Sequence, residues 1–440
     1  MATDRYKGVY RCIRDVQRQL GERTQLAMQF TQCFPNTLET TTELLEDGTT
    51  FIFTGDIPAL WLRDSSAQVH PYLPLAVEDT DMRHMLRGLI QRQACFIQID
   101  PYANAFNREP NGAGHTQDRP QQGPQVWERK YELDSLCYPV RLCYDYWRAT
   151  RDETVFTEDV HAMLQAIVTV METEQYHDER STYRFERPAP CPPSDTLPFD
   201  GRGTRTNFTG MIWSAFRPSD DSCQFGYLIP ANIFAVVVLG YLATIAHEIY
   251  QDTELMKRAR KLRAEVEFGI QTYGVVEHPR FGRIYAYETD GFGHYTLMDD
   301  ANVPSLLSIP YLKYCSANDP LYLRTRRFVL SETNAYYFQG KAARGIGSPH
   351  TPHKYIWPIA LAMQGLTSTE QEEQDEVLKL LTRTTAETNY MHESFSVDDP
   401  MEFTRPWFSW ANSLFSEFLL CYLRGKPSLP DSLLNTRDDD

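Results

Sequence analysis

The segment IFAVVVLGYLATIA, residues 233–246, decides the fold class because it is apolar around its whole circumference. It contains Gly240 and Thr244 and is shorter than the roughly 20 apolar residues that a membrane-spanning helix needs. A helix that is hydrophobic on every side belongs in the core of a large protein. We therefore expect a buried helix over 226–247 that other elements surround.

The next segment, 252–273, has the opposite character, with charged residues on one face and apolar residues on the other. The same alternation runs along the chain. Charged amphipathic helices are predicted at 5–30, 80–98, 152–175, 252–273, 319–332 and 370–388, and apolar ones at 64–77, 133–148, 226–247, 303–315, 354–367 and 408–423. Six charged helices alternating with six apolar ones indicate an outer and an inner ring. The predicted fold is all-α, an (α/α)6 barrel whose long loops form an active-site pocket at one end.

Few segments alternate as strands do, and TTFIFTGDI (49–57) and RIYAYETDG (283–291) are too short for a parallel α/β sheet. Two long loops, 107–125 and 188–209, are rich in Pro and Gly, which suits the rim of a pocket. No linker divides the chain. We expect residues 1–425 to form one catalytic domain and 426–440 to form a polar tail.

The amino-acid composition limits the classes of ligand that the protein is expected to bind. The net charge of -16 disfavours nucleic acid, which requires a basic surface, and the 12% of aromatic residues suits a sugar ligand.

The first residues, MATDRYKGVYRCIRDVQRQL, lack the apolar stretch of a signal peptide, so we expect a cytoplasmic protein without a membrane anchor. The nine cysteines form no Cys-x-x-Cys pair, which argues against a zinc site and a disulfide framework. We also expect a monomer.

A polar and aromatic cluster precedes or opens each apolar segment. The clusters are WLRDSS (61–66), WERKYELDS (127–135), RPSDDS (217–222), MDDAN (298–302), SPHTPHKY (348–355) and TRPWFSWAN (404–412). In an alternating barrel, every connection from an outer to an inner helix lies at the same end. Helix capping explains single Asp and Asn residues there, but not the repeated Trp, Arg and His. The clusters therefore predict one shared pocket.

Several acids in these segments could perform chemistry. Hydrolysis of a glycosidic bond needs two carboxyl groups, one as acid and one as base or nucleophile. Asp220 and Asp221 are adjacent, and Glu393 lies in MHESF. Neighbouring residues at a helix start point in different directions, so at most one of the two aspartates faces the bond, and the residues alone leave open which. The histidines of SPHTPHKY lack the spacing of a helical zinc motif, so no metal site is predicted.

Longer phrases carry a resemblance to a known family. They are FTGDIPALWLRDSSAQVHPYL, DPYANAFN, WERKYELDSLCYP, FRPSDDSCQFGYLIPANIFAVVVL, MDDANVPSLLSIPYL, GIGSPHTPHKYIWPIALAMQGLTS, MHESF and FTRPWFSWANSLFSEFLL. With these phrases the chain resembles glycoside hydrolase family 125 over about residues 5–425, and within it the bacterial exo-acting α-1,6-mannosidases. The resemblance implies an (α/α)6 barrel and hydrolysis with inversion, without a metal or cofactor.

The resemblance also implies roles for the acids. Asp220, or failing that Asp221, is the general acid, and Glu393 is the general base. Asp220 is expected to be protonated at rest and to donate to the leaving oxygen O6. The substrates are terminal α-1,6-linked mannose residues of oligosaccharides, N-glycan or mannan fragments. From the clusters we expect the terminal sugar to be bound by Trp61, Arg63, Asp64, Asp221, Asp299, Asp300, Asn302, His353, Lys354 and Trp407.

Three other interpretations stay open. An (α/α)6 glycosidase that acts on other α-glycosides shares the barrel and the two acids. A sugar epimerase on the same barrel uses a histidine pair, for which His353 and His392 are the candidates. A mannan-binding module would present aromatic side chains on an open face instead of paired acids in a pocket.

Overall fold

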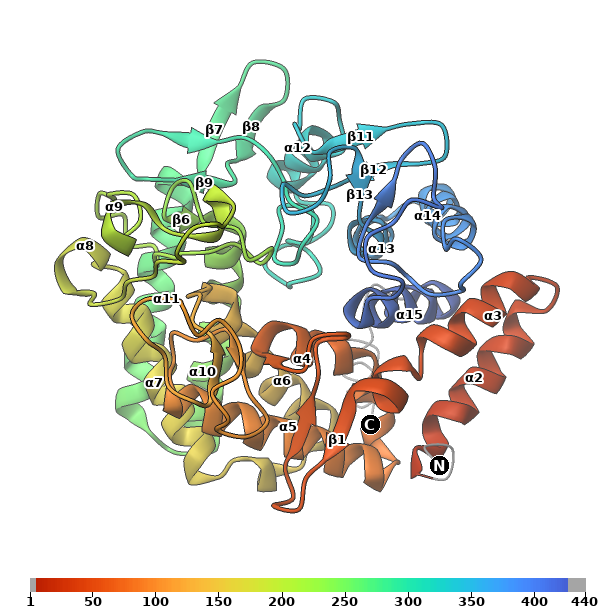
Figure 1. Cartoon of the computed structure of the whole chain (residues 1–440), viewed down its shortest axis with the longest axis horizontal. Coiled ribbons are helices and arrows are strands. Elements are labelled where there is room, and N and C mark those ends of the chain that lie inside the picture. The colour runs from red at the N-terminus through yellow and green to blue at the C-terminus, as the bar shows by residue number, and fades with distance from the viewer. Residues whose placement is uncertain (1–4, 426–440) are drawn as a thin grey trace.

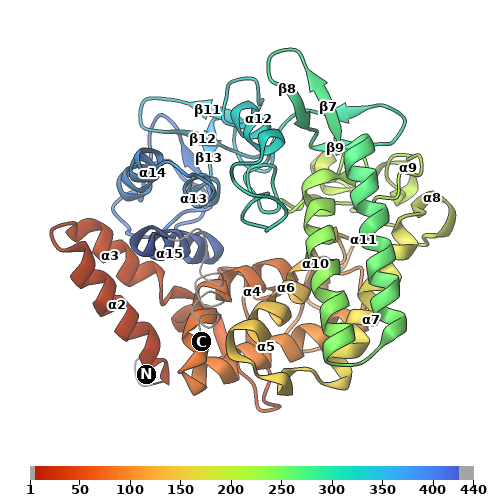
Figure 2. The ribbon, with the colours of Figure 1, turned by 180° about the vertical axis from the view of Figure 1, so that it is seen from behind.

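The computed structural model describes residues 5–425, so the tail predicted at 426–440 lies outside the described residues. Figure 1 shows the helices following one another around a ring, from α2 and α3 through α10 and α11 to α15. Figure 2, from behind, shows α11 on the outer side of α10. The (α/α)6 barrel predicted from the sequence is confirmed.

The outer and inner rings of helices differ in amino-acid composition. The outer helices carry charged or polar faces and are α2 (Lys7–Leu20), α3 (Thr24–Cys33), α5 (Thr80–Ile99), α7 (Glu158–Glu174), α11 (Thr253–Tyr273), α12 (Pro320–Val329) and α14 (Gln371–Arg383). The inner helices are α4 (Leu62–Val69) with η2 (His70–Val77), α6 (Leu133–Thr150), α10 (Ile229–Glu248), α13 (Pro358–Leu366) and α15 (Ser409–Arg424). Short pieces of helix also occur at η1 (Thr37–Thr41), η3 (Glu153–Val155), α8 (His177–Arg180), η4 (Pro193–Asp195) and α9 (Pro198–Gly201).

Helix α10 contains the stretch that decided the fold. It packs against α6 on one side and α11 on the other, and Phe234 meets the ring of Tyr138 edge-on at 5.1 Å. By length and composition α10 could span a membrane, but 78% of its most apolar window is buried inside the molecule. Each large apolar side chain buried here stabilises the fold by about 1.5–3 kcal/mol.

Two predicted helices differ from the structure. The segment 5–30 forms two helices, because Gly21 takes a positive φ of 53° and ends α2. The segment 303–315 is buried in the inner ring as predicted, but it forms turns instead of a helix. Pro304 and Pro310 have no amide hydrogen to donate, and the side chain of Asp299 accepts the amides of Leu306 and Leu307.

Small antiparallel sheets form in the connections that lead from the outer to the inner helices, at the mouth of the barrel. Strands β3 (Leu60–Trp61), β4 (Ala105–Phe106) and β5 (Val126–Glu128) form one sheet, and β6 (Tyr227–Leu228), β9 (Glu288–Thr289) and β10 (Tyr295–Thr296) form another. The two-stranded pairs are β1 (Thr42–Leu44) with β2 (Thr50–Ile52), β7 (Val275–His278) with β8 (Gly282–Tyr285), β11 (Tyr337–Gln339) with β12 (Arg344–Ile346), and β13 (Tyr355–Ile356) with β14 (Phe395–Ser396). Strands β3, β6 and β13 lead almost directly into α4, α10 and α13, so they fix where the polar clusters lie.

Candidate active site

One pocket opens at the mouth of the barrel, where the polar clusters converge. Among the residues expected at the site, Trp61, Arg63, Asp64, Asp220, Asn302 and Glu393 line it. The other lining residues are Thr54, Ile57, Pro218, Ser219, His350, Trp357, Arg405, Phe408 and Trp410. Five of the six clusters reach the pocket directly. The sixth, 127–135, contributes Glu132 and Asp134, which bond to Arg63 from below.

Asp220 is held in the pocket by an unusual backbone conformation. Its φ is 65°, which is uncommon for residues other than Gly but is tolerated by Asp. Its amide donates to the carbonyl of Arg217 at 2.9 Å, and its own carbonyl accepts from Nζ of Lys130 at 2.7 Å. The side chain of Asp220 is 26% exposed. Strained residues of this kind gather at functional sites, where the surrounding structure holds them.

The neighbouring aspartate has a different environment. The side chain of Asp221 is 7% exposed and lies 3.6 Å from Nδ1 of His350, and Ser219 donates to it at 3.5 Å. Asp221 is not among the residues that line the pocket. The two adjacent aspartates therefore diverge, and Asp220 is the one that faces the pocket.

Arg63 gathers four carboxyl groups around one guanidinium. Its Nη1 lies 2.6 Å from Glu132 and 3.1 Å from Asp134, its Nη2 lies 3.3 Å from Asp220, and its Nε lies 3.6 Å from Asp64. The side chain of Arg63 is 3% exposed. Carboxyl groups crowded together in a buried site raise one another's pKa, and the guanidinium opposes that effect. In agreement, burial raises the pKa of Asp64 to about 6.

The carboxyl groups of Glu132 and Asp220 are hydrogen-bonded to each other and titrate together. Burial raises the pKa of Glu132 well above its ordinary value despite the charge of Arg63. Burial alone would raise the pKa of Asp220 too, but the bond with Glu132 and the charges of Arg63, Lys130 and His350 lower it below its ordinary value. Two carboxyl groups form such a bond only when they share a proton, so the pair of Glu132 and Asp220 carries one, and the expectation that Asp220 holds it at rest stays a prediction.

Glu393 reaches the pocket from the other side of the ring. It lies just before β14 in the connection to α15, the sixth inner element, whereas Asp220 lies in the connection to α10, the third. The side chain of Glu393 is 10% exposed, and its carboxylate is 3.4 Å from Nε of Arg405. Two acids at one pocket, from opposite sides, is the arrangement that cleavage of a glycosidic bond requires.

His350 is a pocket residue that sequence reasoning missed. Burial lowers its pKa, but the carboxylates of Asp221, Asp220 and Glu393 outweigh that effect and raise the pKa to about 9. It therefore brings a positive charge to the pocket at neutral pH. The only signal in the sequence was its place in SPHTPHKY, where His353 was chosen instead.

Besides Asp221, five predicted residues lie outside the pocket lining. His353 and Lys354 are exposed, and His353 packs on the ring of Phe338 at 5.0 Å. Trp407 is partly exposed and near Gly55, while Trp410, three residues later, lines the pocket below Arg63.

The other two are Asp299 and Asp300, the acids of MDDAN, whose side chains accept hydrogen bonds from backbone amides. Asp299 is fully buried and accepts the amides of Leu306 and Leu307 at 2.8 and 2.9 Å. Burial raises its pKa to about 8. Asp300 accepts from the backbone and the side chain of Asn302 and from Ser348. Asp300 therefore holds Asn302, which does line the pocket.

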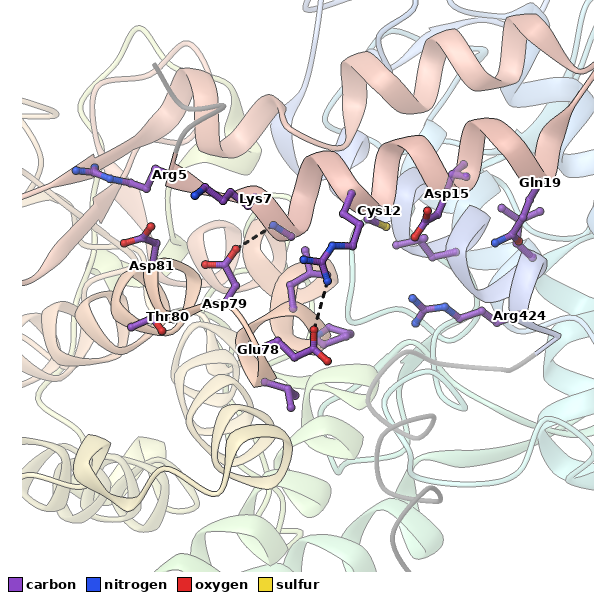
Figure 3. Close-up of a pocket in the computed structure, with 18 residues that line it drawn as sticks. Arg5, Lys7, Cys12, Asp15, Gln19, Glu78, Asp79, Thr80, Asp81 and Arg424 are labelled. Atoms are coloured by element: carbon purple, nitrogen blue, oxygen red, sulfur yellow. Dashed lines mark hydrogen bonds and ion pairs between the residues drawn. The ribbon is translucent and has the colours of Figure 1, made fainter.

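A larger hollow of about 660 Å³ lies at the far end of the barrel, between the start of α2 and the end of α15. Figure 3 shows Arg5 and Lys7 on one side of it, opposite Asp79 and Asp81. Arg11 pairs with Glu78 at 3.5 Å, and Asp79 accepts the amide of Gly8 at 3.0 Å. None of the six clusters reaches this hollow, so the mouth pocket is the candidate site.

Comparisons with known proteins agree with this geometry. A Streptococcus pneumoniae structure, described as a metal-independent α-mannosidase in a non-productive complex with α-1,6-mannobiose, is 46% identical and superposes with a TM-score of 0.93 over 95% of this chain and 98% of that chain. The meiotically up-regulated gene 157 protein of Schizosaccharomyces pombe is 41% identical over 445 residues, covering 96% of this chain and 87% of that protein.

A bacterial glucoamylase complexed with acarbose has a TM-score of 0.54 at 14% identity, covering 88% of this chain and 52% of that chain, which is a likeness of fold alone. The family model of the metal-independent α-mannosidases matches residues 23–420. The chain therefore belongs to glycoside hydrolase family 125, the metal-independent α-mannosidases.

Proposed function

We propose that this α-mannosidase removes terminal, non-reducing α-1,6-linked mannose from oligosaccharides, N-glycan or mannan fragments, acting from the chain end and with inversion. The observation that carries the proposal is that Asp220 and Glu393 line one pocket from opposite sides of the ring. The α-1,6 linkage is supported by the mannobiose that the S. pneumoniae relative binds.

In this mechanism the two acids act in one displacement. Asp220 donates a proton to the glycosidic oxygen O6 as the bond to C1 breaks, and Glu393 takes a proton from the water that attacks C1 on the other face. Arg405, with Nε 3.4 Å from the carboxylate of Glu393, helps to hold the base in place. A single displacement inverts the anomeric carbon, and it requires carboxyl groups about 6.5–9.5 Å apart.

The remaining pocket residues suit a sugar ring. Trp61, Phe408 and Trp410 offer aromatic surfaces, and Asp64 and Asn302 offer hydrogen bonds to hydroxyl groups. His350 supplies a positive charge beside them. A pocket closed by the buried Arg63 cluster below accepts a chain end but not an internal residue, which supports exo action.

The test is proton NMR of the first sugar released from α-1,6-mannobiose, with Asp220→Ala and Glu393→Ala run beside the parent. We expect β-mannose first, and loss of activity in both variants. If α-mannose appears first, the inverting mechanism is wrong. If maltose is cleaved in preference to mannobiose isomers, the α-mannoside specificity is wrong as well.

The epimerase alternative finds no support in the histidines that it needs. His353 is exposed and outside the pocket lining, and His392 is fully buried against Phe403 with Nδ1 at the carbonyl of Arg405. The cytoplasmic location and the monomeric state expected from the sequence stay predictions. Cell fractionation and light scattering on a sizing column test them.

A further inference from the structure

Glu132 lies directly beneath the acid of the proposed reaction. Its side chain is fully buried, while that of Asp220 is 26% exposed toward the pocket. The two carboxyl groups share a hydrogen bond, and two carboxyl groups can bond only when one of them carries a proton. The pair therefore stores one proton a single hydrogen bond away from the pocket.

Charged groups of both signs surround the pair. The charged groups that face it come from four elements and are Arg63 and Asp64 of α4, Lys130 of the loop before α6, Asp134 of α6 and His350 of the loop before β13. Lys130 is also engaged by Asp195 at 2.5 Å, and His350 by Asp221. Among the residues that the structure describes, Arg63 is the cation that contacts both carboxyl groups of the pair.

Glu132 is also built to hold a negative charge. Nη1 of Arg63 and the hydroxyl of Ser135 donate to Oε2 at 2.6 and 2.8 Å, and the amide of Asn104 donates to Oε1 at 3.4 Å. These three donors stabilise a carboxylate at Glu132 once its proton has left. Glu132 can therefore exist in both protonation states without movement of its neighbours.

We propose that Glu132 is a positioning residue for the acid step, which holds the shared proton in the empty pocket and passes it to Asp220 when substrate is bound. The inference rests on the proposed function, because it needs Asp220 to be the general acid. The apolar C–H face of a bound sugar ring over Asp220 removes water from its carboxylate, which favours moving the proton onto it.

The protons balance through one turnover. The proton moves from Glu132 to Asp220, then from Asp220 to the glycosidic oxygen, which keeps the electron pair of the broken C1–O6 bond. Water gives its oxygen to C1 and one proton to Glu393. That proton leaves to solvent, and one proton from solvent restores the pair of Glu132 and Asp220. The sum is hydrolysis of the glycoside by one water.

The test compares two substrates in Glu132→Gln. Gln keeps the shape and can donate to Asp220, but it has no proton to transfer. With α-1,6-mannobiose, whose leaving group needs protonation, we expect kcat to fall by about 10²-fold or more. With 2,4-dinitrophenyl α-mannoside, whose leaving group departs as an anion, we expect a change within a few-fold. The alkaline limb of the mannobiose pH profile should also change shape, because one member of the titrating pair is gone.

Asp134→Asn is the matched control. Asp134 is equally buried and bonds to the same Nη1 of Arg63, but it forms no hydrogen bond with Asp220. A change that acts only through Arg63 should lower the rates on both substrates by the same factor. If Glu132→Gln also lowers both rates equally, or lowers neither, the proposal is wrong.

Two further measurements separate the possible failures. Asp220→Asn tests the acid itself: if it cleaves mannobiose at nearly the parent rate, the proposed function fails, whatever Glu132 does. If Glu132→Gln does not fold, infrared spectra of the parent protein at pH 7 with ¹³C-labelled glutamate decide the matter. A protonated glutamate carboxyl in the ligand-free protein that loses its proton with bound substrate analogue supports the proposal, and its absence overturns it.

Discussion

At the scale of single residues, the site depends on Arg63, whose guanidinium faces Asp64, Glu132, Asp134 and Asp220. Its fork reaches two carboxyl groups from one nitrogen and a third from the other. A lysine keeps the charge but cannot reproduce this geometry. The placement of the acid is therefore coupled to Arg63, a residue that the sequence indicated as a contact to the terminal sugar.

Arg63→Lys tests this coupling. We expect kcat on α-1,6-mannobiose to fall by 10²-fold or more, because Asp220 loses its anchor, and the free energy of unfolding to fall by about 3–5 kcal/mol, as when buried ion pairs are broken. Steady-state kinetics and urea denaturation measure the two effects. Arg92→Lys is the control, since Arg92 pairs with the exposed Asp47 far from the pocket and should change stability by less than about 1 kcal/mol. Equal behaviour of the two variants would contradict the assignment.

His350 gives a second prediction at this scale. Its positive charge helps to lower the pKa of Asp220, so His350→Gln should raise the pKa of the acid. The alkaline limb of kcat/KM should then move to higher pH. Its own pKa of about 9 lies above the unfolded value, so its contribution to stability is full below about pH 6.5 and is lost as the pH rises through 9.

The control for His350 is His353→Gln, in the same loop but outside the pocket. It should leave the pH profile of kcat/KM where it is in the parent. A shift of the alkaline limb to lower pH in His350→Gln, or an equal shift in both variants, would show that His350 does not act on the acid.

At the scale of helices, the hydrophobic pattern predicted eleven of the twelve barrel segments because buried and exposed faces differ so strongly in composition. The segment 303–315 has the same apolar pattern and burial, but Pro304, Pro310 and the capping carboxylate of Asp299 replace its helix with turns. The spacing of apolar residues indicates which segments are buried. It does not indicate a contact such as that between the Asp299 side chain and the backbone amides of Leu306 and Leu307. For the same reason the clusters predicted where the pocket lies. They did not predict that His350 lines it and that His353 lies outside it.

Close packing of inner helices can be tested at Gly365 of α13. A Cβ at Gly365 would lie 2.2 Å from the ring of Phe418 on α15, so Gly365→Ala must move one helix against the other. We expect a loss of about 1–3 kcal/mol in the free energy of unfolding, measured by urea denaturation.

Gly240 of α10 is the matched control for Gly365. A Cβ there meets nothing closer than the side chain of Arg263 at 3.6 Å. Gly240→Ala should therefore stabilise the protein by about 0.5–1 kcal/mol through helix propensity alone. If Gly365→Ala is also stabilising, α13 and α15 are packed less tightly than described.

At the scale of the whole molecule, a second buried polar cluster joins the inner ring about 12 Å below the mouth, eight residues into α4–η2, α6 and α15. Nδ1 of His70 lies 2.9 Å from Glu417, which also accepts from the hydroxyl of Tyr311 at 3.1 Å. Nε of Arg141 donates to Asp145, whose carboxylate also lies 3.6 Å from Nε2 of His70. Four inner elements meet at this cluster, so it should report on the stability of the barrel.

The cluster makes stability depend on pH. Burial lowers the pKa of His70, but the carboxylate of Glu417 and the bond to Asp145 outweigh it, so the pKa is raised. A raised histidine pKa gives stability that is full below about pH 6.5, the unfolded value, and is lost as the pH rises through the folded pKa. Burial raises the pKa of Asp145, but Lys313, His70 and Arg141 outweigh it and lower the pKa. The stability from Asp145 is full above about pH 4 and is lost as the pH falls through its folded pKa.

Glu417→Gln separates these contributions. It removes the main partner of His70, so the difference in free energy of unfolding between parent and variant should be largest near pH 5–6, where His70 is charged in the parent. The difference should shrink as the pH rises through the folded pKa of His70, because the parent then loses that pairing as well. Tm measured from pH 5 to 9 tests this, with Glu376→Gln as control because Glu376 forms an exposed pair with Arg344. A difference in Tm that grows with pH would mean that His70 is neutral in the folded barrel and that the four elements are held by uncharged hydrogen bonds instead.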